Sequence, residues 1–232
     1  MVRRIAIVED EPALAHNYKD ALEREGYRID VYADRPTAEA AFATRLPDLA
    51  IIDIQLGDEV KGGHELCRGL RAASNTLPIM FLTAHDGEID EIVGLSLGAD
   101  DYLSKAISMP QLNARVAALC RKVDAYASDD HQASIIKQGP LELDVDRMTV
   151  CWNGGPVELT LTEFWIVKCM AQRPGHVKSR QQLMDAAEIV VDDQTINSHI
   201  KRIRRKFIDC DPQAEPIKTE YAIGYSWRAT TG

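Results

Sequence analysis

The first half of the chain alternates between short apolar runs and longer amphipathic segments. The apolar runs are rich in Ile, Val and Leu and predict buried strands at Arg4–Val8, Arg28–Tyr32, Leu49–Ile52, Ile79–Leu82 and Asp101–Leu103. Helical spacing of apolar positions predicts helices between and after them, at Pro12–Glu25, Arg35–Arg45, Gly63–Ala73, Gly87–Leu97 and Ser108–Lys122. Five such strand–helix units predict a flavodoxin-like α/β fold, a doubly wound five-stranded parallel sheet with helices on both faces.

The pattern changes after residue 123. Residues 124–134 are polar and lack periodicity, so they predict a linker between a first domain at 1–123 and a second at 135–232. Short alternating segments then predict a small antiparallel sheet at 135–137, 141–144, 148–152 and 157–159. Three helices and a final hairpin are predicted to begin near Thr162, Ser179, Asp193 and Pro216.

Composition excludes several classes of protein. The chain has 232 residues, of which 45% are hydrophobic, enough for two small domains with their own cores. No apolar stretch approaches the roughly 18 residues of a membrane span, and Met1–Ala6 lacks the apolar region of a signal peptide. The five cysteines are scattered without a CxxC pair, which favours core positions in a reducing compartment. These features predict a cytoplasmic protein that does not bind membranes.

Basic residues are concentrated in one segment of an acidic chain. The net charge is −9, but five basic residues lie within Lys201–Lys206. A helix over Asp193–Ile208 would place four apolar residues on one stripe, Ile196, Ile200, Ile203 and Phe207. Its other faces carry side chains suited to phosphates and base edges, namely Gln194, Thr195, Asn197, Ser198, Lys201, Arg202, Arg204 and Arg205.

A solvated basic face is the plainer interpretation of a single helix of this kind. The preceding amphipathic segment at Ser179–Ala187 changes that interpretation, because two helices joined by a short turn form a helix-turn-helix. The second helix of that motif lies in the major groove of DNA. We therefore expect DNA contacts from Asp193–Ile208, with an affinity that depends on salt.

Side chains able to support chemistry follow four of the predicted strands. Glu9 and Asp10 follow the first strand and Asp53 follows the third; Thr83 and Lys105 follow the fourth and fifth. In an open α/β sheet these strand ends meet at one rim, where ligands bind. Each residue alone could be a helix-terminal acid, a cap or a solvated loop residue. Together they predict a site for a hard divalent cation, Mg²⁺, with Asp53 as a carboxylate that accepts a phosphoryl group.

These residues lie in motifs that resemble the receiver domain of two-component response regulators. The motifs are VEDE at 8–11, IIDIQL at 51–56, FLTA at 81–84 and GADDYLSK at 98–105. The resemblance implies that Asp53 accepts phosphate from a histidine kinase, that Thr83 and Lys105 contact the phosphoryl group, and that Tyr102 moves with Thr83 as a switch. It also implies a Mg²⁺ site formed by Glu9, Asp10, Asp53 and the backbone of Gln55.

The chain departs from the receiver pattern around this site. Ala106 follows Lys105 where the family usually has proline, so the loop that carries Lys105 is expected to be held differently. The segment at 56–63 is longer than usual and lacks a proline. We expect this loop to be mobile and to add two acids, Asp58 and Glu59, near the site.

The second half resembles the winged-helix DNA-binding domain of the OmpR/PhoB class. The matching stretches lie at 159–186, 195–207 and 217–227. By this resemblance the domain is an α+β winged helix, Asp193–Ile208 is the recognition helix, and the hairpin at Tyr221–Ile223 is the wing. Tyr221 replaces the usual wing arginine, so no minor-groove contact is assigned. Asn197 replaces a usual aspartate, which changes the expected base preference.

The resemblance also implies partners. Members of this class form homodimers on activation, and Asp101 and Arg115 are present for one intersubunit ion pair. Glu91 and Gln111 replace the usual residues of another pair. Promoter DNA and a cognate histidine kinase are the other expected partners. RNA polymerase is a further one, although the segment at 187–193 lacks the family's Trp-Gly.

The sequence thus predicts a phosphorylation-activated transcriptional regulator and not an enzyme. The first alternative is a phosphorylation-independent, dimeric DNA-binding regulator whose receiver domain is structural. The second is an aspartyl-phosphate phosphatase. It is disfavoured because Gln55 stands where a neighbouring acid would be needed, and because the basic helix would have no role.

Overall fold

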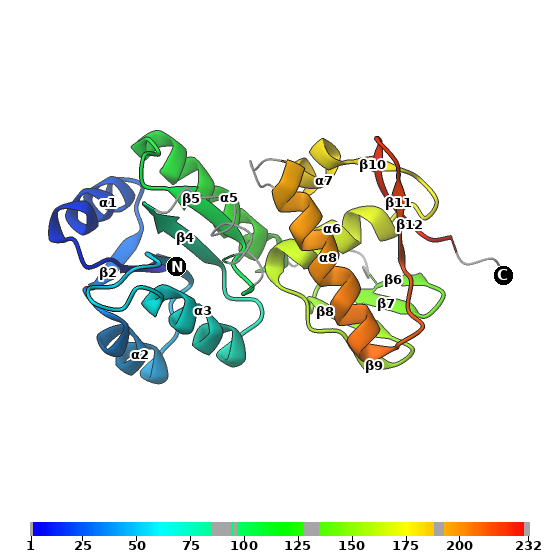
Figure 1. Cartoon of the computed structure of the whole chain (residues 1–232), viewed down its shortest axis with the longest axis horizontal. Coiled ribbons are helices and arrows are strands. Elements are labelled where there is room, and N and C mark those ends of the chain that lie inside the picture. Colours follow the sequence, from blue (N-terminus) through cyan, green and yellow to red (C-terminus); the bar gives the residue numbers. More distant parts are fainter. Residues whose placement is uncertain (1, 85–93, 95–96, 128–134, 188–192, 230–232) are drawn as a thin grey trace. The chain divides into compact units, whose positions relative to one another are not determined.

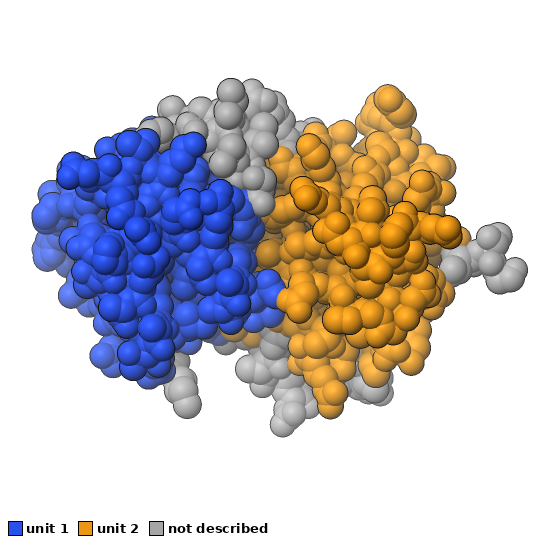
Figure 2. Space-filling model, turned by 60° about the horizontal axis from the view of Figure 1, so that its bottom comes forward, with its two compact units in different colours: residues 1–120 blue, residues 121–232 orange. Residues whose placement is uncertain are grey.

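The structure is a computed structural model that describes residues 2–84, 94, 97–127, 135–187 and 193–229. The chain divides into two compact units, residues 1–120 and 121–232 (Figure 2). Helix α5 (Met109–Ala127) continues into the segment predicted as a linker. Ala125 and Ala127 are strong helix formers, and no glycine or proline stops the helix at residue 124. The segment from 124 to 127 is thus helical. The predicted domain limits at 123 and 135 stay predictions.

The first unit contains a parallel sheet, of which β2, β4 and β5 are labelled in Figure 1. Its strand order is β2-β1-β3-β4-β5. Its strands are β1 (Arg4–Val8), β2 (Arg28–Tyr32), β3 (Leu49–Ile52), β4 (Ile79–Thr83) and β5 (Asp101–Ser104). In addition to α5, the described helices of this unit are α1 (Pro12–Arg24), α2 (Arg35–Thr44) and α3 (Gly62–Ala73). The predicted flavodoxin-like architecture is confirmed, with β4 and β5 one residue longer than expected. Most of the predicted helix at Gly87–Leu97 lies outside the described residues.

Helices cover both faces of this sheet. Because successive residues of a strand point to opposite sides, neighbouring residues of one strand belong to different cores. Ile7 of β1 belongs to a core that includes Tyr18 of α1 and residues of α5. Its neighbour Val8 belongs to the other core, with Phe42 of α2 and residues of α3. Burial on both faces explains the unbroken apolar runs of the sequence. In the central strands β1 and β3 the apolar run is followed directly by acidic residues, and the candidate site lies at these strand ends.

In its described residues, the second unit combines two small antiparallel sheets with the helices named below. One sheet has the order β6-β7-β8-β9 and consists of β6 (Ile135–Gln138), β7 (Leu141–Asp144), β8 (Thr149–Trp152) and β9 (Gly155–Pro156). The other has the order β10-β12-β11 and consists of β10 (Lys178–Ser179), β11 (Ile217–Glu220) and β12 (Gly224–Trp227). The helices are α6 (Leu161–Ala171), α7 (Arg180–Ala186) and α8 (Asp193–Cys210). They share one apolar core with both sheets.

Two local predictions for this unit are wrong. The strand expected at 157–159 is replaced by β9, because Asn153 and Gly154 form a two-residue turn with φ of 50° and 81° that starts the pairing at Gly155. Helix α6 begins at Leu161, not at Thr162. The Thr160 N–H donates to the Glu163 side chain at 2.8 Å, which sets the helix start one residue earlier.

The start predicted for the next helix, near Ser179, is confirmed. The Ser179 hydroxyl accepts a hydrogen bond from the Gln182 N–H at 3.1 Å, and the Gln182 side chain accepts one from the Ser179 N–H at 3.0 Å. This capping box fixes the start of α7. The hairpin β11–β12 also lies where it was predicted, and its tip exposes Tyr221 and Ile223 to 94% and 61%.

Candidate functional site

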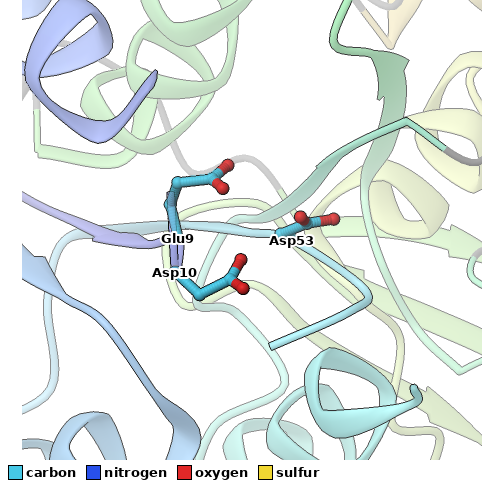
Figure 3. A group of neighbouring side chains, drawn as sticks. All are labelled: Glu9, Asp10 and Asp53. Carbon is cyan, nitrogen blue, oxygen red and sulfur yellow. The ribbon is translucent and has the colours of Figure 1, made fainter. Parts of the chain in front are cut away.

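Three carboxylates from two strand ends meet at the carboxyl edge of the parallel sheet. Glu9 and Asp10 directly follow β1, and Asp53 directly follows β3, which pairs with β1 (Figure 3). One oxygen of each lies within 4.8 Å of the others. Glu9 and Asp53 are buried whereas Asp10 is exposed, so the cluster opens to solvent on the Asp10 side. The sheet therefore concentrates negative charge at one accessible point.

Lys105 partly neutralises this charge. Its Nζ donates to Asp53 Oδ2 at 2.6 Å and to Glu9 at 2.8 Å. Burial raises the pKa of the Glu9 carboxyl, although the hydrogen bond from Lys105 opposes the rise. Burial alone would lower the pKa of Lys105, but its bonds to Asp53 and Glu9 outweigh burial and raise that pKa. Lys105 is thus held as a cation against the two buried acids.

The donor set suits a hard divalent cation. All three cluster side chains offer oxygen atoms, the ligands that Mg²⁺ prefers, and the exposed Asp10 leaves room for water ligands. Asp53 Oδ1 accepts a hydrogen bond from the Ile54 N–H at 2.7 Å, which orients this carboxylate. The residues present therefore fit the predicted metal. A contribution from the Gln55 backbone stays a prediction.

Thr83 and Tyr102 lie on the two strands nearest Lys105. Thr83 is the last residue of β4 and is fully buried, and its carbonyl oxygen accepts a hydrogen bond from the Lys105 N–H at 2.8 Å. Tyr102 of β5 is buried, with its ring centroid 6.1 Å from that of Phe81. The two residues are therefore tied to the strands that present Lys105. Their role as a switch stays a prediction.

The loop after Asp53 is held more firmly than the sequence suggested. Leu56 and Glu59 exchange two backbone hydrogen bonds of 3.1 Å, and the Gly57 N–H donates to Asp10 Oδ2 at 3.0 Å. At the loop's end, a Cβ on Gly63 would lie 2.0 Å from the Asp53 carbonyl oxygen, so only glycine fits there. The loop is thus bonded to Asp10 and packs closely against the backbone of Asp53.

Arg35 at the start of α2 binds this loop, and sequence reasoning missed it. Its guanidinium donates to both oxygens of Glu59, at 2.6 and 3.2 Å. Arg35 therefore lowers the pKa of Glu59. Among the described residues, the group of acids that could hold a metal comprises only Glu9, Asp10 and Asp53. Glu59, which was expected near the site, is bound to Arg35 instead. No local motif links residues 24 positions apart, so the sequence offered no signal for this pair.

Helix α8 buries the apolar stripe that its spacing predicted. Ile196, Ile200, Ile203 and Phe207 are all fully buried. The residues exposed on the polar side include Asn197, Lys201 and Arg205, which follow one another at intervals of four and form one stripe. Ser198 is half-buried, and the side chain of Gln194 lies outside the described part of the chain. The exposed stripe is the part of the predicted DNA-binding set best placed to contact a ligand.

Outside this exposed stripe, three further residues of the predicted set have other partners or are enclosed. Thr195 is only 1% exposed, so its side chain does not face solvent. Arg204 donates to Thr219 Oγ1 at 2.7 Å and to the Ile217 carbonyl at 3.2 Å, which ties α8 to β11. Arg202 binds a buried acid. The sequence assigned these residues by type, but their position on the helix gives them structural contacts.

Glu163 of α6 is the buried acid, and sequence reasoning missed its contacts with α8. Its oxygens accept hydrogen bonds from Arg202 at 2.6 Å and from Lys206 at 2.7 Å. Burial alone would raise the pKa of Glu163, but the charges of Arg202 and Lys206 outweigh burial and lower it to about 2. The triad fastens α8 to α6. With Arg204 bound to β11, three of the five basic residues in Lys201–Lys206 are therefore engaged within the fold.

The residues predicted at a dimer interface pair within one chain. Arg115 of α5 lies 3.3 Å from Asp101 of β5, and Asp101 is only 2% exposed. Gln111 accepts hydrogen bonds from the N–H and hydroxyl of Ser108. Glu91 lies outside the described residues. An intersubunit role for Asp101 and Arg115 stays a prediction.

Within the described part of the chain, every helix is too short or too polar to traverse a bilayer.

Comparison with known proteins matches both units separately and together. Residues 5–117 match the family model of the response regulator receiver domain, and residues 154–227 match that of the C-terminal domain of transcriptional regulatory proteins. The chain is 38% identical to the transcriptional regulatory protein CreB of Escherichia coli over 226 residues, 96% of each chain. It is also 38% identical to the phosphate regulon transcriptional regulatory protein PhoB of Rhizobium meliloti, over 97% of this chain and 99% of the relative. A solved structure of a RitR mutant has a TM-score of 0.75 at 25% identity, covering 98% of this chain and 99% of the other.

Proposed function

The chain belongs to the response regulators of the OmpR/PhoB class, with a receiver domain and a DNA-binding domain that regulates transcription, and on this premise we propose that phosphorylation of Asp53 controls its binding to promoter DNA. The observation that carries the proposal is the arrangement around Asp53. Its carboxylate lies at a solvent-accessible acidic cluster and is hydrogen-bonded to Lys105 at 2.6 Å. An acceptor of a phosphoryl group needs both a nucleophilic oxygen and a nearby cation.

The proposed donor is the phosphohistidine of a cognate sensor kinase. An oxygen of the Asp53 carboxylate attacks phosphorus, and a P–O bond forms as the P–N bond breaks. The electron pair leaves on the imidazole nitrogen, which takes up a proton. Lys105 then stabilises the charge of the new phosphoryl group, and the Thr83 hydroxyl donates a hydrogen bond to it.

Glu9, Asp10 and Asp53 would hold Mg²⁺, with the backbone carbonyl of Gln55. When bound, this ion supplies positive charge that offsets repulsion between the acidic cluster and the incoming phosphoryl oxygens. Glu9 and Asp10 need to be ionised for this role. Because the pKa of Glu9 is raised, this ligand becomes protonated at a higher pH than an ordinary glutamate.

The output side of the proposal is binding of α8 in the major groove. The exposed Lys201 and Arg205 contact phosphates there, while Asn197 and Ser198 approach base edges. Phosphorylation biases Thr83 and Tyr102 toward a state that favours homodimers, which place two recognition helices on repeated half-sites. Asp101 and Arg115 are available to exchange partners across such a dimer. RNA polymerase is a proposed further partner at the promoter.

Removal of the metal tests the phosphoryl-transfer part of the proposal. We expect the full chain to take up label from radioactive acetyl phosphate when Mg²⁺ is present, and to take up only background label when EDTA is added in excess. The reason is that three acidic oxygens repel the phosphoryl donor unless a cation offsets them. Equal labelling with Mg²⁺ and with EDTA would show that the acidic cluster does not act as a metal site.

A further inference from the structure

The side-chain amide of Asn197 is held in one orientation by two neighbours. Its Oδ1 accepts hydrogen bonds from the Tyr225 hydroxyl at 2.7 Å and from Arg180 Nε at 3.2 Å. Tyr225 belongs to β12 and Arg180 begins α7, so three elements of the unit meet at this oxygen. Asn197 itself is exposed on α8, in the same stripe as Lys201 and Arg205. The exposed side chain of Asn197 is thus held in place by residues of α7 and β12.

Arginine decides which end of the amide faces outward. A guanidinium has only donors, so the Asn197 atom that meets Arg180 has to be the oxygen. The tyrosine hydroxyl could donate or accept and would not settle the orientation alone. In the described part of the chain, the Asn197 amide nitrogen has no hydrogen-bond partner, which leaves both of its N–H groups for a ligand.

Tyr225 is itself fixed, which makes this arrangement rigid. Its side chain is buried, with 6% exposed, and the guanidinium carbons of Arg180 and Arg204 each lie 5.8 Å from the ring centroid. Cations near an aromatic face are attracted by the ring quadrupole. Arg204 is further bonded to Thr219 and Ile217, so the hydroxyl that meets Asn197 cannot swing away freely.

We propose that Asn197 reads DNA only as a hydrogen-bond donor, and selects a base that offers acceptors in the major groove, guanine or thymine. This inference rests on the proposed function, in which α8 lies in that groove. Asparagine usually recognises adenine by donating to N7 while its oxygen accepts from N6. Here the oxygen is occupied by Tyr225 and Arg180, so the pairing with adenine is incomplete. Cytosine, which offers a donor, meets two N–H groups and is rejected.

A purely bracing role is the alternative interpretation of the same contacts. Asn197 would then only connect α7, α8 and β12, and no base position would depend on it. The two interpretations differ in base preference and not in stability. The test therefore has to measure the ratio of affinities for different bases.

The deciding experiment selects duplexes from a random-sequence library with the phosphodonor-treated full chain, and compares wild type with Asn197→Asp. The aspartate keeps an oxygen for Arg180 and Tyr225 but presents a second oxygen outward. We expect one base position in each half-site to change from guanine or thymine to cytosine or adenine, with a preference of about fivefold or more. That position is the one that Asn197 faces.

A second variant, Arg180→Met, removes the pure donor that determines the orientation of the Asn197 amide. We expect it to relax the preference at the same position by allowing adenine, about fivefold relative to wild type. The matched control is Arg173→Met, which removes an exposed arginine that does not contact Asn197 and is expected to leave the preference unchanged.

Three results would overturn the inference. The first is a wild-type preference for adenine or cytosine at the position that changes, and the second is an identical preference in wild type and Asn197→Asp. In both of these cases DNA recognition by α8 would stand. The third is a wild-type chain that selects no sequence at all, and this result alone would also overturn the proposed function.

Discussion

The Asp53→Asn variant is expected to take up no phosphoryl group from acetyl phosphate and Mg²⁺. Asparagine has nearly the shape of aspartate but lacks the charged nucleophilic oxygen, and its neutral amide is a poor nucleophile toward phosphorus. The variant also loses the charge that Lys105 contacts at 2.6 Å. The measurement is the intact mass of the full chain before and after treatment, in which wild type gains one phosphoryl group.

A neighbouring substitution provides the control. Asp58→Asn makes the same chemical change in the loop that follows Asp53, at an exposed residue outside the acidic cluster. This variant is expected to gain the phosphoryl mass as wild type does. Matching circular dichroism spectra of the three proteins would show that the fold is intact. Phosphorylation of Asp53→Asn to the wild-type extent would place the acceptor elsewhere.

The Glu163→Gln variant is expected to lower the free energy of unfolding of the second unit by about 3 kcal/mol at neutral pH. The estimate follows from the pKa of Glu163, about 2 in the folded chain against an ordinary value of 4.5. Glutamine resembles the protonated side chain and leaves Arg202 and Lys206 without their buried counter-charge. Urea unfolding followed by tryptophan fluorescence measures the effect, since Trp152, Trp165 and Trp227 all lie in this unit.

An exposed acid of the same unit is the matched control. Glu215 pairs with Arg228 at 2.9 Å, but its side chain is 73% exposed. Glu215→Gln is therefore expected to change the free energy of unfolding by less than about 1 kcal/mol. Similar losses in the two variants would mean that burial does not strengthen the Glu163 contacts.

The pH dependence of unfolding follows from the same group. Because folding lowers the pKa of Glu163, its contribution is fully present above the unfolded pKa of about 4.5. The contribution is lost as the pH falls from about 4.5 toward about 2. Over this range the free energy of unfolding of wild type should fall by about 3 kcal/mol more than that of Glu163→Gln. Parallel curves for the two proteins would contradict the assigned pKa.

The parallel sheet and the acidic cluster could be predicted because both depend on local pattern. A strand buried on both faces is an unbroken apolar run, and residues such as Asp53 mark the point where that run ends. Parallel strands bring those ends together whatever the loops do, so Glu9, Asp53 and Lys105 are found side by side. The place of this site in the fold could thus be predicted before any distance was known.

Contacts between distant segments could not be predicted in the same way. Arg35 binds Glu59, and Glu163 binds Arg202, across 24 and 39 positions of the chain. Nothing in the local pattern distinguishes a basic residue that binds a buried acid from one that faces solvent. The DNA-binding set was therefore chosen by residue type, whereas the structure separates the exposed Lys201 from the engaged Arg202.

The affinity of the full chain for DNA, with and without phosphodonor, decides whether phosphorylation of Asp53 controls DNA binding. A duplex selected from a random library would be titrated with wild type, and the dissociation constant measured before and after treatment with acetyl phosphate and Mg²⁺. We predict that treatment tightens binding about 5- to 150-fold, the range of a coupling free energy of about 1–3 kcal/mol. Asp53→Asn should bind equally under both conditions. Equal affinity of wild type with and without phosphodonor would contradict the account and favour a regulator whose receiver domain is structural.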